Sequence, residues 1–136
     1  MRLEITRRAD LAVRAVRELA AAPDRMKAQA LADALDTTTG FVPQVVGPLV
    51  KAGWVRSDPG PTGGYELQAS LDQLSVLDVI EAVDGPTDDG RCVVADVDCD
   101  AGQPCVLHDA WTSARDELTD SLRSMPISSL EPRERR

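Results

Sequence analysis

The chain has 136 residues, of which 43% are hydrophobic and 3% aromatic, enough for one domain whose core is built from Val, Leu and Ala. It contains no apolar run near the roughly 18 residues that a membrane helix needs, and residues 1–8 lack the apolar core of a secretion signal. We therefore expect a cytoplasmic protein with no membrane contact. The net charge of −8 is unevenly spread: residues 1–70 carry nine Lys and Arg against eight Asp and Glu, whereas residues 71–136 carry six against fifteen. Because DNA binding needs a local basic face, only the first half is a candidate for it.

Three helices are predicted in the first fifty residues. Apolar residues recur at intervals of three and four over residues 7–21, and Thr6 is placed to cap that helix. A second, shorter helix is predicted over residues 26–35, and the Asp-Thr-Thr-Thr-Gly segment that follows ends it. A third helix is expected to begin near Gly40. Its apolar side consists of Phe41, Val45, Val46, Leu49 and Val50.

The second and third helices, joined by a tight turn, have the pattern of a helix-turn-helix. In this motif the second helix enters the major groove of DNA and reads bases with its N-terminal residues. Glutamine can pair with adenine through two hydrogen bonds, and threonine hydroxyls can bind bases or phosphate. The candidate base-reading residues are Thr37, Thr38, Thr39, Gly40 and Gln44.

Two prolines fall within this third helix. Pro43 is tolerated in the first turn, where backbone N–H groups have no helical partner. Pro48 lies deeper and removes the hydrogen bond to Gln44, which costs about 3 kcal/mol in a helix interior. With Gly47 before it, we expect a kink or an early end of the helix near Pro48.

A β-hairpin is predicted directly after the helix-turn-helix. Residues 54–57 and 65–67 are the strand candidates, and residues 58–64 between them consist of turn-forming types rich in Gly and Pro. The hairpin could be a plain connection, but its position favours a wing, which makes the motif a winged helix. Further candidate DNA contacts at the helix end and the wing are Lys51, Arg56, Thr62, Gly63 and Tyr65.

Two more helices are predicted in the second half. Ser75 and Asp78 have the spacing of a capping box that opens a helix over residues 76–83. The longest helix is predicted over residues 106–125. Since one small domain already has its core, the apolar stripe of this helix is expected to pack against a second copy. The stripe consists of Leu107, Trp111, Ala114, Leu118, Leu122 and Met125. The charged end, residues 131–136, is expected to be disordered.

All three cysteines and the only histidine, Cys92, Cys99, Cys105 and His108, fall within one short segment. Three thiols and an imidazole can bind a soft metal ion or a cluster, and an odd number of thiols in a reducing compartment favours ligation over disulfides. Zinc suits these ligand types, although the tight spacing of most zinc knuckles is absent. Buried cysteines without a function, a calcium site and a cysteine nucleophile paired with His108 fit the pattern less well.

Several stretches, in this order and spacing, resemble the family of winged-helix iron–sulfur regulators that includes IscR, NsrR and RirA. They are residues 9–14, 49–55, 63–67 and 77–85, followed by the three cysteines, and the resemblance covers nearly the whole chain. It implies a mainly α protein with a small β-hairpin. Residues 1–70 would form a winged helix-turn-helix that binds DNA, and residues 71–130 a cluster-binding loop and a dimerisation helix.

The resemblance also implies a function and a cofactor. It implies a homodimeric transcription regulator, not an enzyme, whose affinity for a double-stranded DNA operator is set by an iron–sulfur cluster that senses redox state, nitric oxide or iron supply. A 2Fe–2S cluster is favoured over 4Fe–4S, and the cluster can be lost during purification. The alternative is a winged-helix regulator or protein-binding module with a structural zinc and no redox sensing.

The family implies three cysteine ligands from one subunit and a fourth ligand that varies. The spacing of the cysteines and His108 looks most like that of IscR, except that the first gap is one residue longer, and it favours His108 as the fourth ligand. The NsrR branch instead uses an aspartate from the first helix of the other subunit. The matching position makes Asp10 of the partner subunit the alternative fourth ligand.

Two departures from the family concern DNA, and one feature of the loop concerns the cluster. Pro59 stands where the family often has an arginine in the wing, so Arg56 or Arg25 is expected to contact phosphate instead. Pro43 stands where IscR has a base-discriminating glutamate, so the IscR operator does not carry over. In the loop, only Arg91 opposes five aspartates, an excess of negative charge that lowers the reduction potential of a cluster. These aspartates are Asp88, Asp89, Asp96, Asp98 and Asp100.

Overall fold

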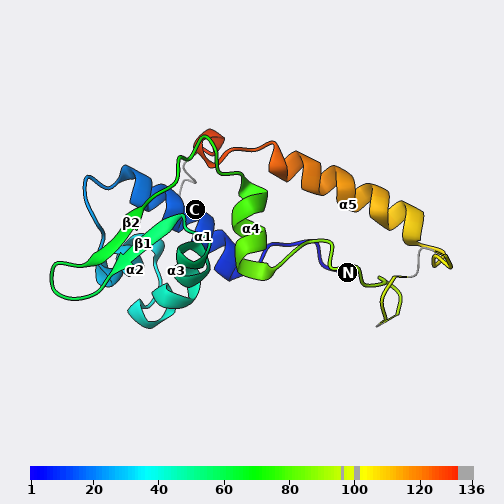
Figure 1. Cartoon of the computed structure of the whole chain (residues 1–136), viewed down its shortest axis with the longest axis horizontal. Helices are drawn as coiled ribbons and strands as arrows, with labels where there is room; N and C mark the ends of the chain where they lie inside the picture. Colours follow the sequence, from blue (N-terminus) through cyan, green and yellow to red (C-terminus); the bar gives the residue numbers. More distant parts are fainter. Residues whose placement is uncertain (96, 100–101, 132–136) are drawn as a thin grey trace.

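The structure is a computed structural model that describes residues 1–95, 97–99 and 102–131. Its first half gathers three helices and a hairpin, and its second half adds two helices joined by a long loop (Figure 1). This confirms the predicted fold class, mainly α with a small antiparallel hairpin. The end predicted to be disordered, residues 131–136, lies outside the described residues except for Glu131. In chain order the elements are α1 (Arg7–Ala21), α2 (Ala28–Leu35), η1 (Thr39–Phe41), α3 (Val42–Lys51), β1 (Val55–Asp58), β2 (Gly64–Leu67), α4 (Val76–Asp84), α5 (His108–Arg123) and η2 (Ile127–Ser129).

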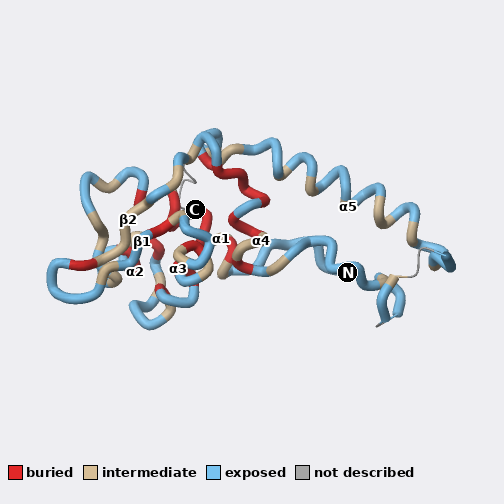
Figure 2. Tube along the Cα trace, in the orientation of Figure 1, coloured by how far each residue is buried: buried red, intermediate tan, exposed pale blue. Residues whose placement is uncertain are grey.

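The hydrophobic core lies between α1, α2, α3 and α4, as the buried segments in Figure 2 show. Helix α1 has the predicted bounds, and the side-chain oxygen of Thr6 caps it by accepting a hydrogen bond from the N–H of Ala9 at 3.1 Å. Small residues on α1, including Ala9, Ala12 and Ala15, are completely buried in this core. The largest fully buried side chains are Leu11, Leu31, Leu35, Leu49, Ile127, Val16, Val42, Val45, Val46 and Val79.

Helix α2 begins at Ala28, two residues later than predicted, because Met26 takes part in the wing. The N–H of Met26 donates to the carbonyl of Tyr65 at 3.0 Å, and the N–H of Tyr65 donates back at 2.8 Å. Because Tyr65 is already paired with Ser57 of β1, this bridge places Met26 along the other edge of β2. It therefore attaches the wing to the start of the helix-turn-helix.

Of the two outcomes expected at Pro48, a kink or an early end of α3, the early end is wrong, because the helix continues to Lys51. Proline is disfavoured in a helix partly because its ring meets the Cβ of the preceding residue, and here that residue is Gly47, which has none. The carbonyl of Gln44, which loses its partner to Pro48, belongs to an exposed residue and can bind water. The opposite face of the helix, which includes Val46 and Leu49, is buried, and this burial stabilises the helix beyond Pro48.

The wing consists of β1 and β2 in antiparallel register, with Val55 opposite Leu67 and Asp58 opposite Gly64. The predicted strands over residues 54–57 and 65–67 are confirmed to within one residue. The turn between them requires glycine at Gly63, where a Cβ would lie 2.0 Å from the carbonyl oxygen of Asp58. No other residue type fits this turn without moving the backbone.

Helix α4 confirms the predicted capping box. The hydroxyl of Ser75 accepts from the N–H of Asp78 at 3.0 Å, and the carboxylate of Asp78 accepts from the N–H of Ser75 at 2.9 Å. The chain returns to this point after α5, because the N–H of Val76 donates to the carbonyl of Met125 at 2.9 Å. Ile127 follows and is completely buried, which fixes the end of the described chain on the core.

Helix α5 extends away from the rest of the molecule, and the loop with the cysteines lies at its far end (Figure 1). It begins at His108 instead of Val106, because the N–H of His108 closes a turn onto the carbonyl of Cys105 at 3.1 Å. It ends at Arg123 because Met125 and Pro126 are extended against Ser75 and Val76. None of its residues is buried. No helix in the described part of the chain is long and apolar enough to cross a membrane.

Candidate functional site

The segment between α4 and α5 folds back on itself as a short hairpin. The N–H of Cys99 donates to the carbonyl of Gly90 at 2.7 Å, and the N–H of Cys92 donates to the carbonyl of Val97 at 2.9 Å. Between these bonds Arg91 and Asp98 form a β-bridge. The backbone therefore holds Cys92 and Cys99 near each other without help from a ligand.

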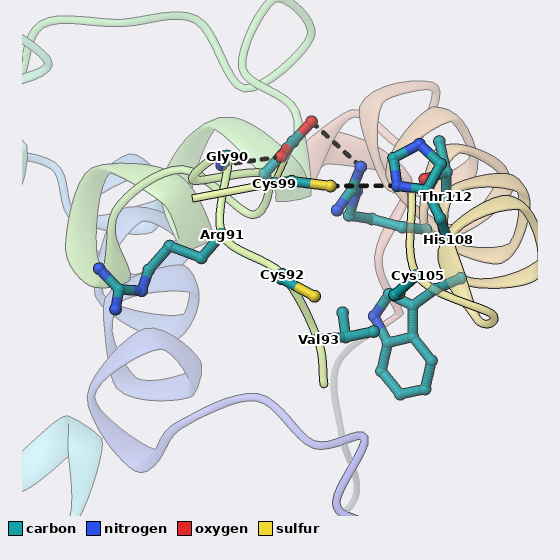
Figure 3. Close-up of a pocket in the computed structure, with 11 residues that line it drawn as sticks. Gly90, Arg91, Cys92, Val93, Cys99, Cys105, His108 and Thr112 are labelled. Carbon is teal, nitrogen blue, oxygen red and sulfur yellow. Dashed lines mark hydrogen bonds and ion pairs between the residues drawn. The ribbon is translucent and has the colours of Figure 1, made fainter. Parts of the chain in front are cut away.

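The three thiols and the imidazole line one pocket of about 170 Å³, formed by this hairpin and the first turns of α5 (Figure 3). Cys99 Sγ lies 3.1 Å from Nδ1 of His108. The structure thus brings together the four side chains that the sequence predicts as ligands. No group of three or more Cys, His, Asp or Glu side chains in the described residues is arranged as it would be around a metal ion. Ligation would require these side chains to move closer together.

The electrostatic environments of two thiols differ. The pKa of Cys92 is lowered because the backbone N–H groups of Val94 and Ala95 donate to its sulfur, an effect that burial partly opposes. The pKa of Cys99 is raised, first by burial and then by the negative charges of the neighbouring thiolates; the guanidinium of Arg115 acts in the opposite direction. Without a ligand, the thiol of Cys92 is therefore more easily deprotonated than that of Cys99.

An ion pair that the sequence did not reveal closes the pocket on one side. Arg115 of α5 lies seven residues after His108 and therefore on the same helix face. Its Nη2 is 3.1 Å from Oδ2 of Asp88, which belongs to the loop that follows α4. The helix period, counted from His108, would have identified Arg115 as a pocket residue. Because Arg115 pairs with Asp88, Arg91 is not the only cation that opposes the loop aspartates.

The alternative fourth ligand, Asp10, does not line this pocket in the same chain. It lies in the first turn of α1, where its carboxylate is 4.0 Å from the guanidinium of Arg14. Asp96 and Asp100, two of the acidic residues expected to depress the reduction potential, lie outside the described residues. Ligation by Asp10 of a partner subunit stays a prediction.

The candidate base-reading residues surround the N-terminus of α3. Thr38, Thr39, Gly40 and Gln44 are exposed and Thr37 is half-buried. The hydroxyl of Thr39 donates to Oε1 of Gln29 at 2.8 Å, so it also links the turn to α2. Thr38, Gly40 and Gln44 are exposed at the N-terminus of α3, so this surface is accessible to a DNA groove.

Two arginines, Arg56 of β1 and Arg25 shortly before α2, are paired with acidic residues of the wing. Arg25 lies 3.1 Å from Asp58 and 3.6 Å from Glu66, and Arg56 lies 3.1 Å from Asp58. One or the other is expected to contact phosphate, and either would have to exchange these acidic partners for DNA. The ammonium group of Lys27 donates to the carbonyl of Pro61 at the wing tip.

The other predicted contacts of this region differ in exposure. Lys51 and Thr62 are exposed, and Tyr65 is half-buried. Gly63 is buried in the wing turn, where it shapes the backbone. Direct contact of these residues with DNA stays a prediction.

The order of these parts matches a known family along most of the chain. The model of the Rrf2 family, described as "Iron-dependent Transcriptional regulator", matches residues 5–131. The chain belongs to the Rrf2 family. As an Rrf2 protein it is a DNA-binding transcriptional regulator.

Curated Rrf2-like relatives carry regulator names. IscR of Vibrio vulnificus is 36% identical over 90 residues, which cover 66% of this chain and 53% of that protein. A protein of Neisseria meningitidis named as an HTH-type transcriptional regulator is 29% identical over 130 residues, 94% of this chain and 87% of that protein. The match to IscR therefore spans about half of that protein's length.

Solved structures share the fold of this Rrf2 chain at low sequence identity. CymR of B. subtilis, described as the global cysteine regulator, superposes with a TM-score of 0.73 at 23% identity, covering 93% of this chain and 95% of its own. IscR of T. potens superposes with a TM-score of 0.70 at 20% identity, covering 93% and 84%. Both confirm the winged-helix architecture.

Proposed function

We propose that this Rrf2 protein is a homodimer whose affinity for an operator in double-stranded DNA depends on an iron–sulfur cluster. Cys92, Cys99, Cys105 and His108 of one subunit would hold the cluster, with Asp10 of the partner subunit as the alternative to His108. One observation carries the proposal: all three thiols of the chain and its only imidazole line the same pocket. Thiolate and imidazole are the ligand types that such clusters use.

The donor set fits this cofactor in number and in chemistry. Three cysteines and one histidine suit a 2Fe–2S cluster, which we favour over 4Fe–4S. When bound, the cluster would supply a centre that exchanges an electron, reacts with nitric oxide or is lost when iron is scarce. The contribution of the chain is a hairpin that presents Cys92 and Cys99 and a helix that presents His108 from its first turn.

The start of the loop is attached directly to the first half of the chain, and its end is attached only through the length of α5, which gives the loop a way to act on the first half. At the start, the hydroxyl of Thr6 donates to Asp84 at 2.8 Å, and the guanidinium of Arg8 donates to the carbonyl of Val83 at 2.5 Å. At the other end of α5, Ile127 is buried in the core. A change in how the pocket is held therefore biases the positions of α1 and α4, and through their packing that of α3.

We propose that a second copy of the chain packs against α5. The stripe predicted for dimerisation stays open in the single chain: Leu118 is 47% and Met125 39% exposed, and Trp111 and Leu122 are only half-buried. A helix of this length that buries no residue in its own chain needs a partner to remove its apolar face from water. Two copies joined along α5 would hold two winged heads at a fixed separation, as binding to a two-fold operator requires.

Residues 1–70 are the proposed DNA-binding region, and residues 71–130 the proposed sensing and dimerisation region. The N-terminus of α3 would read bases, and the end of α3 and the wing would bind phosphates. The proposed contacts are Thr37, Thr38, Thr39, Gly40, Gln44, Lys51, Arg56, Thr62, Gly63 and Tyr65.

A comparison of DNA affinity with and without the cluster tests this function. A duplex is first selected from a random-sequence library with anaerobically reconstituted protein, and its dissociation constant is then measured by fluorescence anisotropy for the reconstituted and the metal-free protein. We expect a difference of about 5-fold to 150-fold, the usual range for coupled sites. The variant Cys105→Ala should have the same affinity in both preparations. Equal affinities for the unmodified protein would refute the proposal.

A structural zinc is the second candidate, and the donor set supports it as well. Three cysteines and one histidine form a common structural zinc site. In that case the metal would hold the loop in place. Oxidants and nitric oxide, at concentrations too low to modify cysteine thiols, would leave the DNA affinity unchanged. The metal content of the purified protein separates the two candidates.

A further inference from the structure

The metal pocket contains a cation whose orientation is fixed before any ligand binds. Arg115 lines the pocket together with the three cysteines and His108, and its side chain is only 19% exposed. Its Nη2 lies 3.1 Å from Oδ2 of Asp88, and the other carboxylate oxygen of Asp88 accepts from the N–H of Gly90 at 3.0 Å. The loop backbone therefore holds the carboxylate, and the carboxylate orients the guanidinium.

One donor of this guanidinium is not used. Nε of Arg115 is buried and has no hydrogen-bond acceptor among the described residues. A buried N–H of a charged group without an acceptor is costly, so such a group usually serves a ligand or an ordered water. In this pocket the groups that would become anionic on ligation are the three thiols.

We propose that Arg115 is a positioning residue for the anionic cluster site and that its positive charge raises the reduction potential of the bound cluster. This inference rests on the proposed function. Reduction adds negative charge to a centre already held by thiolates, and a fixed cation nearby stabilises the reduced state.

A purely mechanical role is the rival explanation. In that case the ion pair would only attach the loop to α5, and the sign of each charge would not matter. The substitutions Arg115→Gln and Asp88→Asn break the same ion pair, so both should loosen the loop equally. Their effects on the potential should be opposite, because one removes a positive charge from the pocket and the other removes a negative charge.

The experiment is a redox titration of the full-length, anaerobically reconstituted protein, followed by visible absorbance at low ionic strength, where the charge of the exposed Asp88 is least screened. We expect Arg115→Gln to lower the equilibrium constant for one-electron reduction of the cluster about tenfold, which lowers the reduction potential by about 59 mV. Asp88→Asn should raise the reduction potential. Arg115→Lys keeps the charge and should lie nearer the unmodified protein than Arg115→Gln. Arg123→Gln removes a charge from an exposed position on the same helix, where Arg123 pairs with Asp120 at 2.6 Å, and should leave the potential unchanged.

Amide hydrogen exchange over residues 86–92 of the metal-free protein measures the loosening separately and should increase alike in Arg115→Gln and Asp88→Asn. The inference would be overturned if the reduction potentials of the two variants shifted in the same direction, or if neither potential shifted. The proposed function would still stand in that case, provided that the unmodified protein shows cluster absorbance. If Arg115→Gln does not take up the cluster, the direction of the shift in Asp88→Asn decides alone. Absence of cluster absorbance from the unmodified protein would overturn both.

Discussion

The hydroxyl of Thr6 donates to the carboxylate of Asp84 at 2.8 Å to one oxygen and 3.0 Å to the other, while the same hydroxyl oxygen caps α1 by accepting from Ala9. One side chain therefore joins the first turn of α1 to the last residue of α4, from which the cysteine loop departs. In the proposed function this contact carries changes in the loop to the helices that hold α3.

We expect Asp84→Ala to reduce the difference in DNA affinity between reconstituted and metal-free protein. It removes the acceptor for Thr6 but leaves Thr6 free to cap α1, so the fold should be retained. Substitutions along a coupling route usually change the coupling by about 0.5–2 kcal/mol. Anisotropy titrations of both preparations measure the change. Asp72→Ala, an exposed carboxylate before α4, is the matched control, and an Asp84→Ala protein with undiminished coupling would exclude this route.

The wing turn should not tolerate a side chain at Gly63. A Cβ there would lie 2.0 Å from the carbonyl oxygen of Asp58, so Gly63→Ala forces the hairpin backbone to move. We expect it to lower the free energy of unfolding by about 1–3 kcal/mol, as strained backbone positions do, and to weaken DNA binding. Urea denaturation measures the first effect. Gly40→Ala, where a Cβ meets no atom within 4 Å, should unfold at nearly the same urea concentration as the unmodified protein.

The stripe on α5 should be needed for dimers. Leu118→Asp places a charge in the middle of the stripe, at a position that is 47% exposed in the single chain. A charged group there costs little in the monomer but cannot be buried against a second copy. Analytical ultracentrifugation at low micromolar concentration should show a dimer for the unmodified protein and for Glu117→Gln, and a monomer for Leu118→Asp. A dimer in all three would place the interface elsewhere.

Two substitutions should affect DNA binding in different ways. Gln44→Ala, at the exposed N-terminal part of α3, should cost about 1–3 kcal/mol on the selected operator and relax the preference at one base pair. Lys51→Ala should weaken binding to all sequences alike and reduce the slope of log affinity against log salt by about one. Binding assays with operator variants at several salt concentrations distinguish the two. Equal behaviour of both variants would contradict the assignment of Gln44 to base reading.

Local patterns were sufficient to predict much of the fold. The Thr6 cap, the Ser75–Asp78 capping box and the Gly-rich wing turn are set by residues close in sequence, and the structure confirms them. The apolar period also predicted the bounds of α1. These elements depend on nearest neighbours, so sequence spacing describes them adequately.

Most of the errors arose where a contact between residues distant in sequence overrode a local rule. Helix α2 begins late because Met26 pairs with Tyr65, and α3 passes Pro48 because one of its faces is buried and Gly47 removes a clash. The ion pair of Arg115 with Asp88 was missed because the two residues come from opposite sides of the loop. Clustering in sequence, in contrast, was enough to predict which thiols and imidazole share a pocket.

The central claim is that the pocket of Cys92, Cys99, Cys105 and His108 holds an iron–sulfur cluster. The most direct test is an anaerobic visible spectrum of the purified protein together with its iron, acid-labile sulfide and zinc content. We predict visible absorbance with iron and sulfide in equal amounts, both lost in Cys92→Ala, Cys99→Ala and Cys105→Ala. A colourless protein that contains zinc and no sulfide after anaerobic purification and reconstitution would contradict the account.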